Sequence, residues 1–265
     1  MAEYKKKDDI ERQKLKRPLL KRIIVRFDYT SIADMQKALN KVVGYLKPPK
    51  GFFSTFDQMA ITNDSKQGTG TSVQGENKIE PVVYRFSGCT IEPKQKVILD
   101  FARNNLCLDI HCDENYEAID KYLDVMIELM SIIMKNEEFV QLNRIGIRKI
   151  DGADEITLKE ADEIFEYFSQ RLQWTAKDQM LLQQYTDQMY CSDLLAYVIY
   201  NRIVRFVPES GKYRFTLDID CYKEANQIER RPNKAWLEDA LDKMNKKMFD
   251  LFKMGIRLEY FNKYL

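Results

Sequence analysis

The sequence predicts an α+β protein made of two tandem, duplicated ferredoxin-like-type halves, with antiparallel sheets and helices packed on one face. Three observations lead to this prediction. Segments of strand character alternate with amphipathic helical segments, an early strand resembles one near the middle, and a later strand resembles one near the end. The 265 residues, 45% of them hydrophobic, suffice for one large domain or two small ones.

The predicted first half spans residues 18–141 and follows a charged N-terminal arm at residues 1–17. Its first strand, residues 21–29, is rich in β-branched and aromatic residues. A helix then begins after Ser31 and Asp34, which are expected to form a capping box, and must end before two consecutive prolines. The remaining elements are strands at residues 52–62, 82–86, 96–103 and 106–112, and a helix at residues 116–135.

Two connections of this half have a recognisable composition. The polar residues 63–78 contain three of the ten glycines and predict a flexible loop. No Gly-Lys-Ser/Thr follows these glycines, so the segment does not match a phosphate-binding loop. The dipeptide Asn104-Asn105 predicts a tight hairpin between its flanking strands.

The predicted second half, residues 142–265, repeats the order of the first. Its elements are strands at residues 142–150, 195–207 and 213–222, and helices at residues 158–172 and 232–254. A Pro-Glu-Ser-Gly turn joins the last two strands, and Pro232 is expected in the first turn of the last helix. Residues 177–193 show no clear pattern, and the sequence leaves their fold open.

Two pairs of matching segments indicate the duplication. Residues 20–26 (LKRIIVR) align without gaps on residues 142–148 (LNRIGIR), and residues 106–112 (LCLDIHC) align on residues 215–221 (FTLDIDC). Strands share a restricted alphabet, so one match could arise by chance. Because both matches occur in the same order, each followed by a helix, we expect a duplication.

Residue alternation along these strands predicts a sheet face that carries arginines and aspartates. Cross-strand Arg–Asp pairing explains such a face without any function. The functional interpretation is a surface that binds a ligand or partner. The candidate residues of this binding face are Arg22, Arg26, Arg144, Arg148, Asp109 and Asp218.

The composition argues against several functional classes. Lysine and arginine number 42 against 41 acidic residues, which argues against a chain-wide electrostatic nucleic-acid binder. The N-terminus lacks an apolar signal segment, and no run approaches the ~18 apolar residues of a membrane span, so no membrane partner is expected. The five cysteines form no CxxC pair, which favours a reduced, cytoplasmic location.

The residues needed for common catalytic sites are sparse. His111 is the single histidine, which removes every two-histidine metal motif. Cys107, Asp109 and His111 share a strand face, but their ~7 Å spacing is too wide for one tetrahedral ion. Neither Cys107 nor Cys112 has a helix N-terminus or CxxC context that would lower a thiol pKa. We therefore expect no catalytic residue, no metal and no cofactor, and favour a protein without enzymatic activity.

Three segments carry a resemblance to a known family: RPLLKRIIVRF near the beginning, LNRIGIRKI in the middle, and FTLDIDCYKE followed by a helix closing on MFDLFKMGIRLEYFNKYL. Together they resemble the sporadically distributed family of uncharacterised bacterial proteins of about this length. The resemblance covers nearly the whole chain, from about residue 17 to residue 265. It implies a bacterial origin but no activity, because the family has none established. Its patchy distribution is similar to that of mobile or antiviral-defence genes.

Three functional hypotheses follow. The first is a non-catalytic binding or adaptor protein that self-associates or binds a protein partner, as a subunit of a defence-associated or mobile-element system. The second is an RNA-binding or RNA-processing protein that uses the sheet faces of tandem ferredoxin-like modules, with RNA expected before DNA. Near-neutral charge and the lack of a strand with RNP-type aromatics argue against it. The third is an unfamiliar metal-dependent enzyme, which a metal-induced rise in melting temperature would support.

Overall fold

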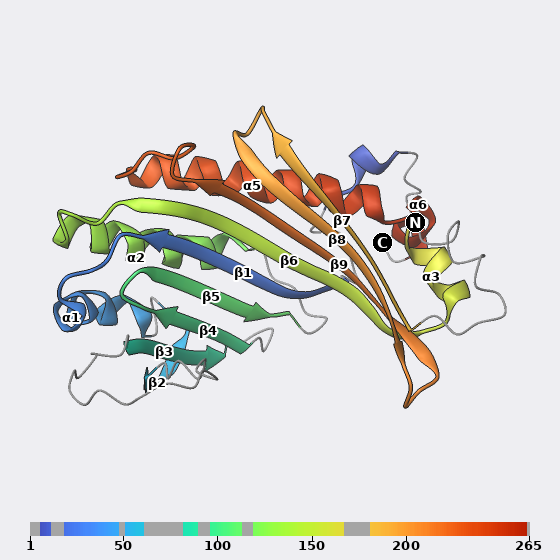
Figure 1. Cartoon of the computed structure of the whole chain (residues 1–265), viewed down its shortest axis with the longest axis horizontal. Coiled ribbons are helices and arrows are strands. Elements are labelled where there is room, and N and C mark those ends of the chain that lie inside the picture. The colour runs from blue at the N-terminus through green and yellow to red at the C-terminus, as the bar shows by residue number, and fades with distance from the viewer. Residues whose placement is uncertain are drawn as a thin grey trace, which may run out of the picture.

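The computed structural model describes residues 6–11, 19–47, 51–60, 82–89, 96–112, 119–166 and 181–263. The described strands form one antiparallel sheet of nine strands in the order β2-β3-β4-β5-β1-β6-β9-β8-β7 (Figure 1). The strands are β1 (Leu20–Tyr29), β2 (Phe53–Ala60), β3 (Val82–Cys89), β4 (Lys96–Phe101), β5 (Asn105–His111), β6 (Leu142–Ile156), β7 (Leu182–Cys191), β8 (Ala196–Val207) and β9 (Lys212–Glu224). The helices are α1 (Met35–Leu46), α2 (Asp120–Asn136), α3 (Leu158–Ile164), α5 (Lys234–Gly255) and α6 (Leu258–Lys263), preceded by the 3-10 turn η1 (Lys7–Asp9).

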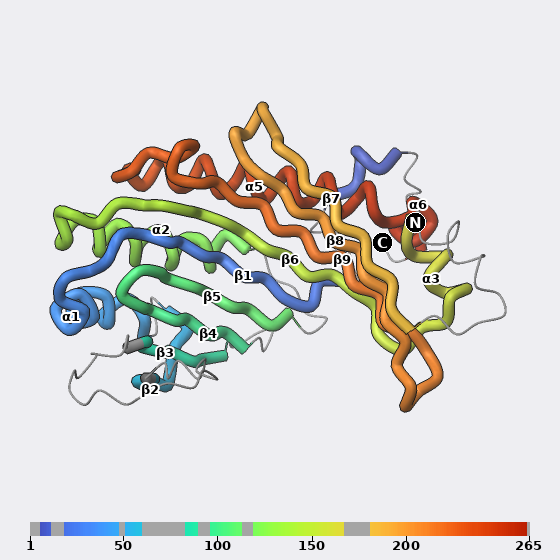
Figure 2. The backbone as a smooth tube through the Cα atoms, viewed as in Figure 1, coloured from blue at the N-terminus to red at the C-terminus, as the bar shows by residue number. Residues whose placement is uncertain are grey.

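The sheet continues without a break from the predicted first half into the second. β1 pairs antiparallel with β6 along its whole length, from Leu20 opposite Asp151 to Tyr29 opposite Leu142. The α+β class and the antiparallel pairing are therefore confirmed, whereas the two expected sheets are one. In the path traced by Figure 2, β1 pairs with β5 and β6 pairs with β9, so each half pairs its first strand with its last.

The ferredoxin-like part of the prediction is not confirmed. A ferredoxin-like module has the order β-α-β-β-α-β, with a strand after its second helix. Here the described strands of the first half all precede α2, and those of the second half all precede α5. Each half thus has one strand, one helix, a run of neighbouring strands and a long helix.

The strand register also differs between the halves. Arg22 on β1 lies opposite His111 on β5. Arg144, the residue aligned with Arg22, lies opposite Glu224 and not opposite Asp220, which aligns with His111. The pairing of the second half is thus displaced by four residues. Because the displacement is even, every side chain stays on its expected face of the sheet.

The long helices α1, α2 and α5 cover one face of the sheet (Figure 1). The side chains beneath them are apolar and closely packed, and Ile23, Val25 and Phe27 of β1 have no exposed surface. The predicted apolar sides of β5 and β9 are buried in the same core. The alternation of these strands therefore reports the buried face correctly.

Two helices begin with a different residue than expected. The side chain of Asp34 accepts a hydrogen bond from the backbone N–H three residues later, at 2.9 Å, and caps α1. Asp34 itself is therefore the N-cap, and Ser31 is not. Asn233 caps α5 in the same way, which places Pro232 before the cap and not in the first turn.

Other boundaries are shifted. β3 continues to Cys89 and β6 to Ile156, both beyond their predicted ends. The helix predicted for residues 158–172 ends at Ile164, because Phe165 leaves it to form a β-bridge with Ile256. The Asn104-Asn105 hairpin is confirmed, although Asn105 already belongs to β5. Most of the helix predicted for residues 116–135 appears as α2, and the loop predicted at residues 63–78 lies outside the described residues.

The described part of the N-terminal arm is docked onto the protein. Lys7 Nζ donates a hydrogen bond to Glu166 Oε1 at 3.0 Å. Ile10 is only 3% exposed and belongs to the hydrophobic core. Residues 6–11 thus pack against the second half, although the charge of the arm suggests a solvated segment.

Candidate binding face

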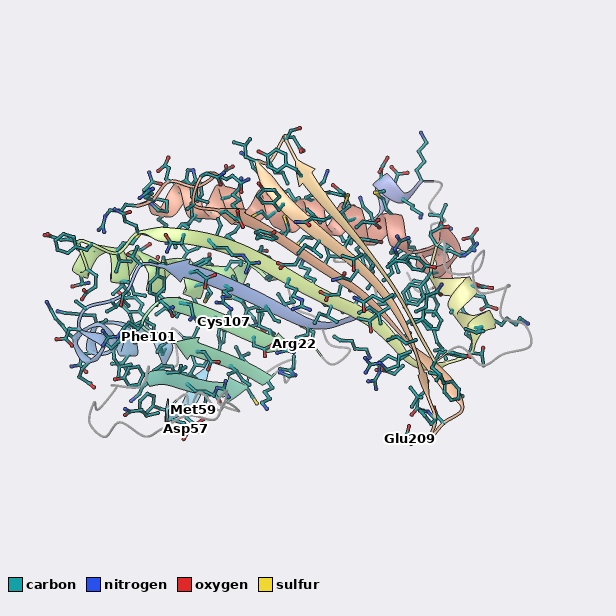
Figure 3. All side chains as sticks on the ribbon, viewed as in Figure 1. Arg22, Asp57, Met59, Phe101, Cys107 and Glu209 are labelled. Carbon is teal, nitrogen blue, oxygen red and sulfur yellow. The ribbon has the colours of Figure 1, made fainter. Side chains whose placement is uncertain are left out.

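The sheet face opposite α1, α2 and α5 is called the open face here. Strand pairing places its side chains in rows that run across the strands, and one row crosses all nine of them. From β2 to β7 this row consists of Asp57, Arg85, Asp100, Cys107, Arg26, Gly146, Tyr222, Tyr197 and Tyr190. Figure 3 labels Asp57, Cys107 and Arg22 of this face, which lie on β2, β5 and β1. The row changes from charged to aromatic as it passes the centre of the sheet.

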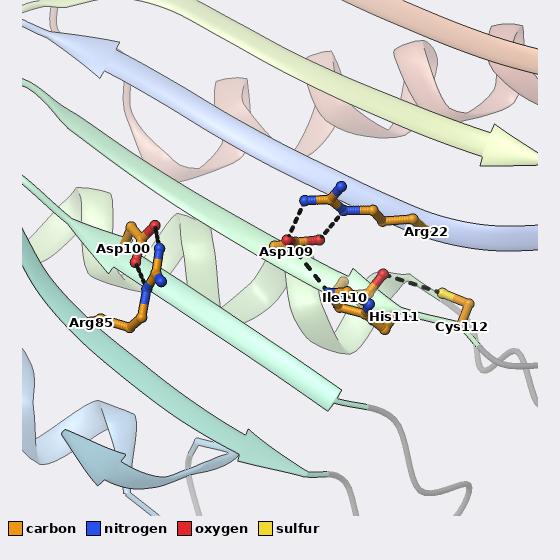
Figure 4. A network of polar contacts seen from close by, with 7 residues as sticks. All are labelled: Arg22, Arg85, Asp100, Asp109, Ile110, His111 and Cys112. Atoms are coloured by element: carbon orange, nitrogen blue, oxygen red, sulfur yellow. Dashed lines mark hydrogen bonds and ion pairs between the residues drawn. The ribbon is translucent and has the colours of Figure 1, made fainter. Parts of the chain in front are cut away.

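Two bidentate ion pairs occupy the open face of the first half (Figure 4). The guanidinium of Arg22 donates from Nε and Nη2 to the two carboxylate oxygens of Asp109, both at 2.6 Å. Arg85 binds Asp100 in the same way, with both distances 2.7 Å. The hydrogen bond to Asp109 raises the pKa of Arg22 above its ordinary value, which keeps this guanidinium charged.

Two further pairs join β6 to β9. Arg148 donates to the carboxylate of Asp218 at 2.8 and 2.6 Å, and Arg144 donates to Asp220 at 3.0 Å. Asp218 is only 5% exposed although it lies on the open face. Burial raises the pKa of the neighbouring Asp220 above its ordinary value, and the charges of Arg144 and Arg148 only partly oppose this.

All six residues predicted for the binding face share the open face, and each of them has an ionic partner. The remaining arginine, Arg26, donates to Asp28 on its own strand at 2.7 Å and is about half exposed. Each of the six predicted residues thus has its charge offset by a neighbouring side chain. This is the cross-strand and local pairing that explains the residues without any function.

A row of three tyrosines, which we call the tyrosine row, extends the face across β9, β8 and β7. The ring centroids of Tyr190 and Tyr197 lie 5.2 Å apart, and those of Tyr197 and Tyr222 lie 5.5 Å apart. The guanidinium carbon of Arg144 lies 4.3 Å from the centroid of the Tyr222 ring, which is cation–π geometry. Tyr190 at the end of the row is 51% exposed.

Gly146 makes room for the contact between Arg144 and the Tyr222 ring. It lies opposite Tyr222 on the open face, and a Cβ atom at this position would be 3.1 Å from the Cβ atom of Tyr222. With no side chain between Arg144 and Arg148, both arginines can reach across toward β9. The glycine therefore connects the charged part of the row to the tyrosines.

The sequence interpretation missed the tyrosine row because residues 177–193 were not assigned. A recognisable signal was present. The segment Tyr190-Cys-Ser-Asp-Leu-Leu-Ala-Tyr197 has turn-forming Ser192 and Asp193 next to its centre. A hairpin centred between Asp193 and Leu194 places Tyr190 opposite Tyr197, as the structure shows. Tyr222 then follows from its alternation with Asp218 and Asp220.

The face offers no activated nucleophile. Burial raises the pKa of the Cys107 thiol on this face to about 11, so this thiol is protonated at neutral pH. His111 Nε2 lies 3.6 Å from an Asp109 oxygen, within an ion-pair network that also includes Arg22. The described residues contain no group of three potential ligands that could hold a metal ion.

The chain matches no known protein family and no curated protein. The helices in the described part of the chain are each too short or too polar to cross a membrane.

Proposed function

We propose that this chain is a non-catalytic binding protein that recognises a protein partner with its open face. The observation that carries the proposal is the row of nine residues across the sheet, in which paired arginines lead into three tyrosines. Tyrosine and arginine are the residues that contribute most to the energy of protein interfaces. Arginines held in bidentate pairs lose little conformational freedom on binding, which favours affinity.

The charge of the face favours a protein over a nucleic acid. Five arginines of the face bind an aspartate each: Arg22, Arg26, Arg85, Arg144 and Arg148. A phosphate backbone needs uncompensated positive charge, and here it would have to displace carboxylates from their guanidinium partners. A protein surface with its own mixed charges meets no such repulsion.

The proposal also includes the biological setting inferred from the sequence. We place the chain in the sporadically distributed bacterial family, in the cytoplasm, as an adaptor subunit of a defence-associated or mobile-element system. We further propose that its two halves arose by duplication of one unit. The shared strand–helix–strands–helix order supports the duplication, and under this proposal the strand pairing of the second half has since shifted by four residues.

Single-stranded RNA is the second candidate, and the tyrosine row favours it. Sheet-bound aromatics that stack on successive bases are a common way to bind single strands. Three neighbouring rings with centroids 5.2 and 5.5 Å apart, with Arg144 over Tyr222, would serve as such a platform. In this case Arg22, Arg26, Arg144 and Arg148 would contact the phosphates.

The first test is native purification of the untagged protein from its own host, with measurement of the complex mass and of the 260/280 nm absorbance ratio. We expect one protein partner in fixed stoichiometry and a ratio typical of protein. Nucleic acid that stays bound at moderate salt would instead favour RNA over a protein as the partner.

The second test asks which residues bind the purified partner. We expect the double variant Tyr197→Ala, Tyr222→Ala to weaken binding at least tenfold, since large aromatic truncations in an interface core cost about 2 kcal/mol or more. Phe139→Ala is the matched control, because Phe139 is 89% exposed in the turn between α2 and β6. Equal affinities of the double variant and the control would overturn the role of the open face. The same variants, titrated with a fluorescent single-stranded RNA of about 20 nucleotides, test the RNA candidate.

A further inference from the structure

β7 forms one edge of the sheet. Its ten residues pair with β8 on one side, from Leu182 opposite Arg205 to Cys191 opposite Ala196, and no bulge interrupts the register. Within the described chain, no strand pairs with its other side. The outer side of β7 therefore presents a long, regular row of backbone N–H and C=O groups.

This edge lacks the features that keep edge strands from pairing with other chains. Such features are lysines, prolines, bulges and short length. The β7 sequence LQQYTDQMYC contains no lysine, arginine or proline, and its one charge, Asp187, is bound by Arg202 at 2.7 Å. By contrast β2, the other edge, is shorter and its pairing with β3 has an irregularity after Phe53.

Exposed apolar side chains gather at the same edge. The described residues include seven large hydrophobic side chains that are exposed, and four of them lie in β7 or directly beside it. They are Leu181, Leu182, Tyr190 and Leu195, with exposed fractions of 66%, 55%, 51% and 52%. Apolar surface concentrated on an unpaired edge is typical of an interface.

The backbone geometry shows which residues can pair outward. The Phe206 N–H donates to the Leu181 carbonyl at 2.9 Å, so Leu181 directs its backbone groups toward β8. In an antiparallel strand this orientation alternates with period two. The residues that direct their backbone groups outward are therefore Leu182, Gln184, Thr186, Gln188 and Tyr190.

We propose that β7 is a dimerisation edge, which pairs antiparallel with β7 of a second copy around a two-fold axis at Thr186. In this register Thr186 lies opposite its own copy, Gln184 opposite Gln188, and Leu182 opposite Tyr190. All five outward residues then form hydrogen-bonded pairs, with about ten backbone hydrogen bonds in total. The exposed leucine and tyrosine at each end cover each other.

Charge selects this register over its neighbour. An axis at Asp187 also pairs outward-directed residues, but it sets the two Asp187 carboxylates directly opposite each other, which is destabilising. The axis at Thr186 sets Asp187 opposite Tyr185 of the second copy. The axis at Thr186 thus avoids this repulsion and makes the strand complementary to itself, as a symmetric dimer requires.

The dimer would also join the two open faces. Tyr190 belongs both to β7 and to the tyrosine row, so the row of each copy would end opposite Leu182 of the other copy, four positions from the axis. The dimer does not depend on the open face binding a partner, because its contacts are backbone hydrogen bonds along β7. Each proposal can therefore fail without the other.

The test compares Thr186→Pro with Thr186→Val by light scattering during size-exclusion chromatography. Proline removes the outward N–H at the axis but leaves the pairing with β8 intact, whereas valine keeps the N–H and the β-branched shape. We expect the wild type and Thr186→Val at twice the 31.4 kDa chain mass, and Thr186→Pro as a folded monomer with a dimer dissociation constant at least about 30-fold higher. A monomeric wild type overturns the proposal and leaves a peptide of another protein as the occupant of the edge. A dimer that Thr186→Pro leaves unchanged places the interface elsewhere.

Cysteine cross-linking tests the register. In a Cys89→Ser, Cys191→Ser background, Thr186→Cys should form an intermolecular disulfide on mild oxidation, because paired Cα atoms about 5.5 Å apart suit a disulfide. Gln184→Cys should not, because its own copy is four positions away along the edge. Rapid cross-linking of Asp187→Cys but not of Thr186→Cys would contradict the axis at Thr186.

Discussion

The central strands β1 and β6 lie side by side and carry similar sequences, LKRIIVRFDY and LNRIGIRKID, yet they face different surroundings. Toward the helices, β1 contributes Phe27 with no exposed surface. At the aligned position β6 contributes Lys149, which is 4% exposed and donates a hydrogen bond to Asn245 of α5. One pattern of alternation thus supports an apolar core under one strand and a polar contact under the other.

The strands differ on the open face as well. At one position β1 carries Ile24, and the aligned position of β6 is Gly146. The glycine lets Arg144 lie over Tyr222 and connects the arginines with the tyrosine row. At these aligned positions β1 therefore contributes apolar packing, whereas β6 contributes polar contacts to α5 and β9.

The largest expected effect concerns the buried face. Phe27→Ala should reduce the free energy of unfolding by about 3–5 kcal/mol, because it leaves a large cavity in a closely packed core. Lys149→Met should cost less than about 2 kcal/mol, because methionine keeps most of the volume and removes one donor to Asn245. Urea unfolding followed by circular dichroism measures both. Equal losses of unfolding free energy would show that β1 and β6 contribute equally to stability at these positions.

The next effect concerns the ion pairs of the open face. Arg148→Ala should cost about 2–3 kcal/mol, since it leaves the buried Asp218 carboxylate without its partner. Arg22→Ala should cost about 1 kcal/mol, because Asp109 is more exposed and can be hydrated. Arg26→Ala is the control and should cost less than about 0.5 kcal/mol, because Arg26 pairs with Asp28 in solvent. A larger loss of unfolding free energy for Arg26→Ala than for Arg148→Ala would contradict the expectation that burial of the aspartate partner sets the cost.

The sequence predicted those parts of the molecule that local patterns determine. Alternation in the central strands identified the buried side and placed Arg22 and Arg148 on the open face. The prolines and polar cap residues bounded α1 and α5 to within a few residues. These features depend on neighbours along the chain, and the structure places them nearly as expected.

Features that depend on distant pairing could not be predicted in the same way. A two-sheet and a one-sheet arrangement give the same alternation, and only the pairing of β1 with β6 distinguishes them. β7 escaped assignment because its open-face side chains are all exposed and its other side is only partly buried, so the strand lacks the clear apolar alternation of a half-buried strand. Without β7, the tyrosine row had only two of its three strands, those that carry Tyr197 and Tyr222, and Tyr190 was missing from it.

A smaller effect tests the role of Gly146. Gly146→Ala should stay within about 1 kcal/mol of the wild type, because its new methyl group meets only a side-chain carbon of Tyr222. Gly146→Val should cost about 1–2 kcal/mol and change the near-ultraviolet circular dichroism of the tyrosines, because it displaces Tyr222 from Arg144. Ile24→Val at the aligned position of β1 is the control and should leave that spectrum unchanged. A wild-type spectrum for Gly146→Val would show that the glycine does not position the tyrosine row.

The smallest effect is a pH dependence of the folding stability that arises from Asp220, where β9 pairs with β6. Burial raises the pKa of Asp220 in the folded protein above the ordinary value of about 3.9 that applies in the unfolded chain. Between these two values the folded state binds more protons than the unfolded state, so the contribution of Asp220 to stability decreases as the pH rises. Asp220→Asn removes this titration, and its stability relative to the wild type should therefore increase from pH 4 upward and then level off. Urea unfolding of Asp220→Asn and of the wild type at each pH measures this difference in the free energy of unfolding. A relative stability of Asp220→Asn that falls with rising pH would show that Arg144 and Arg148 outweigh burial at this site.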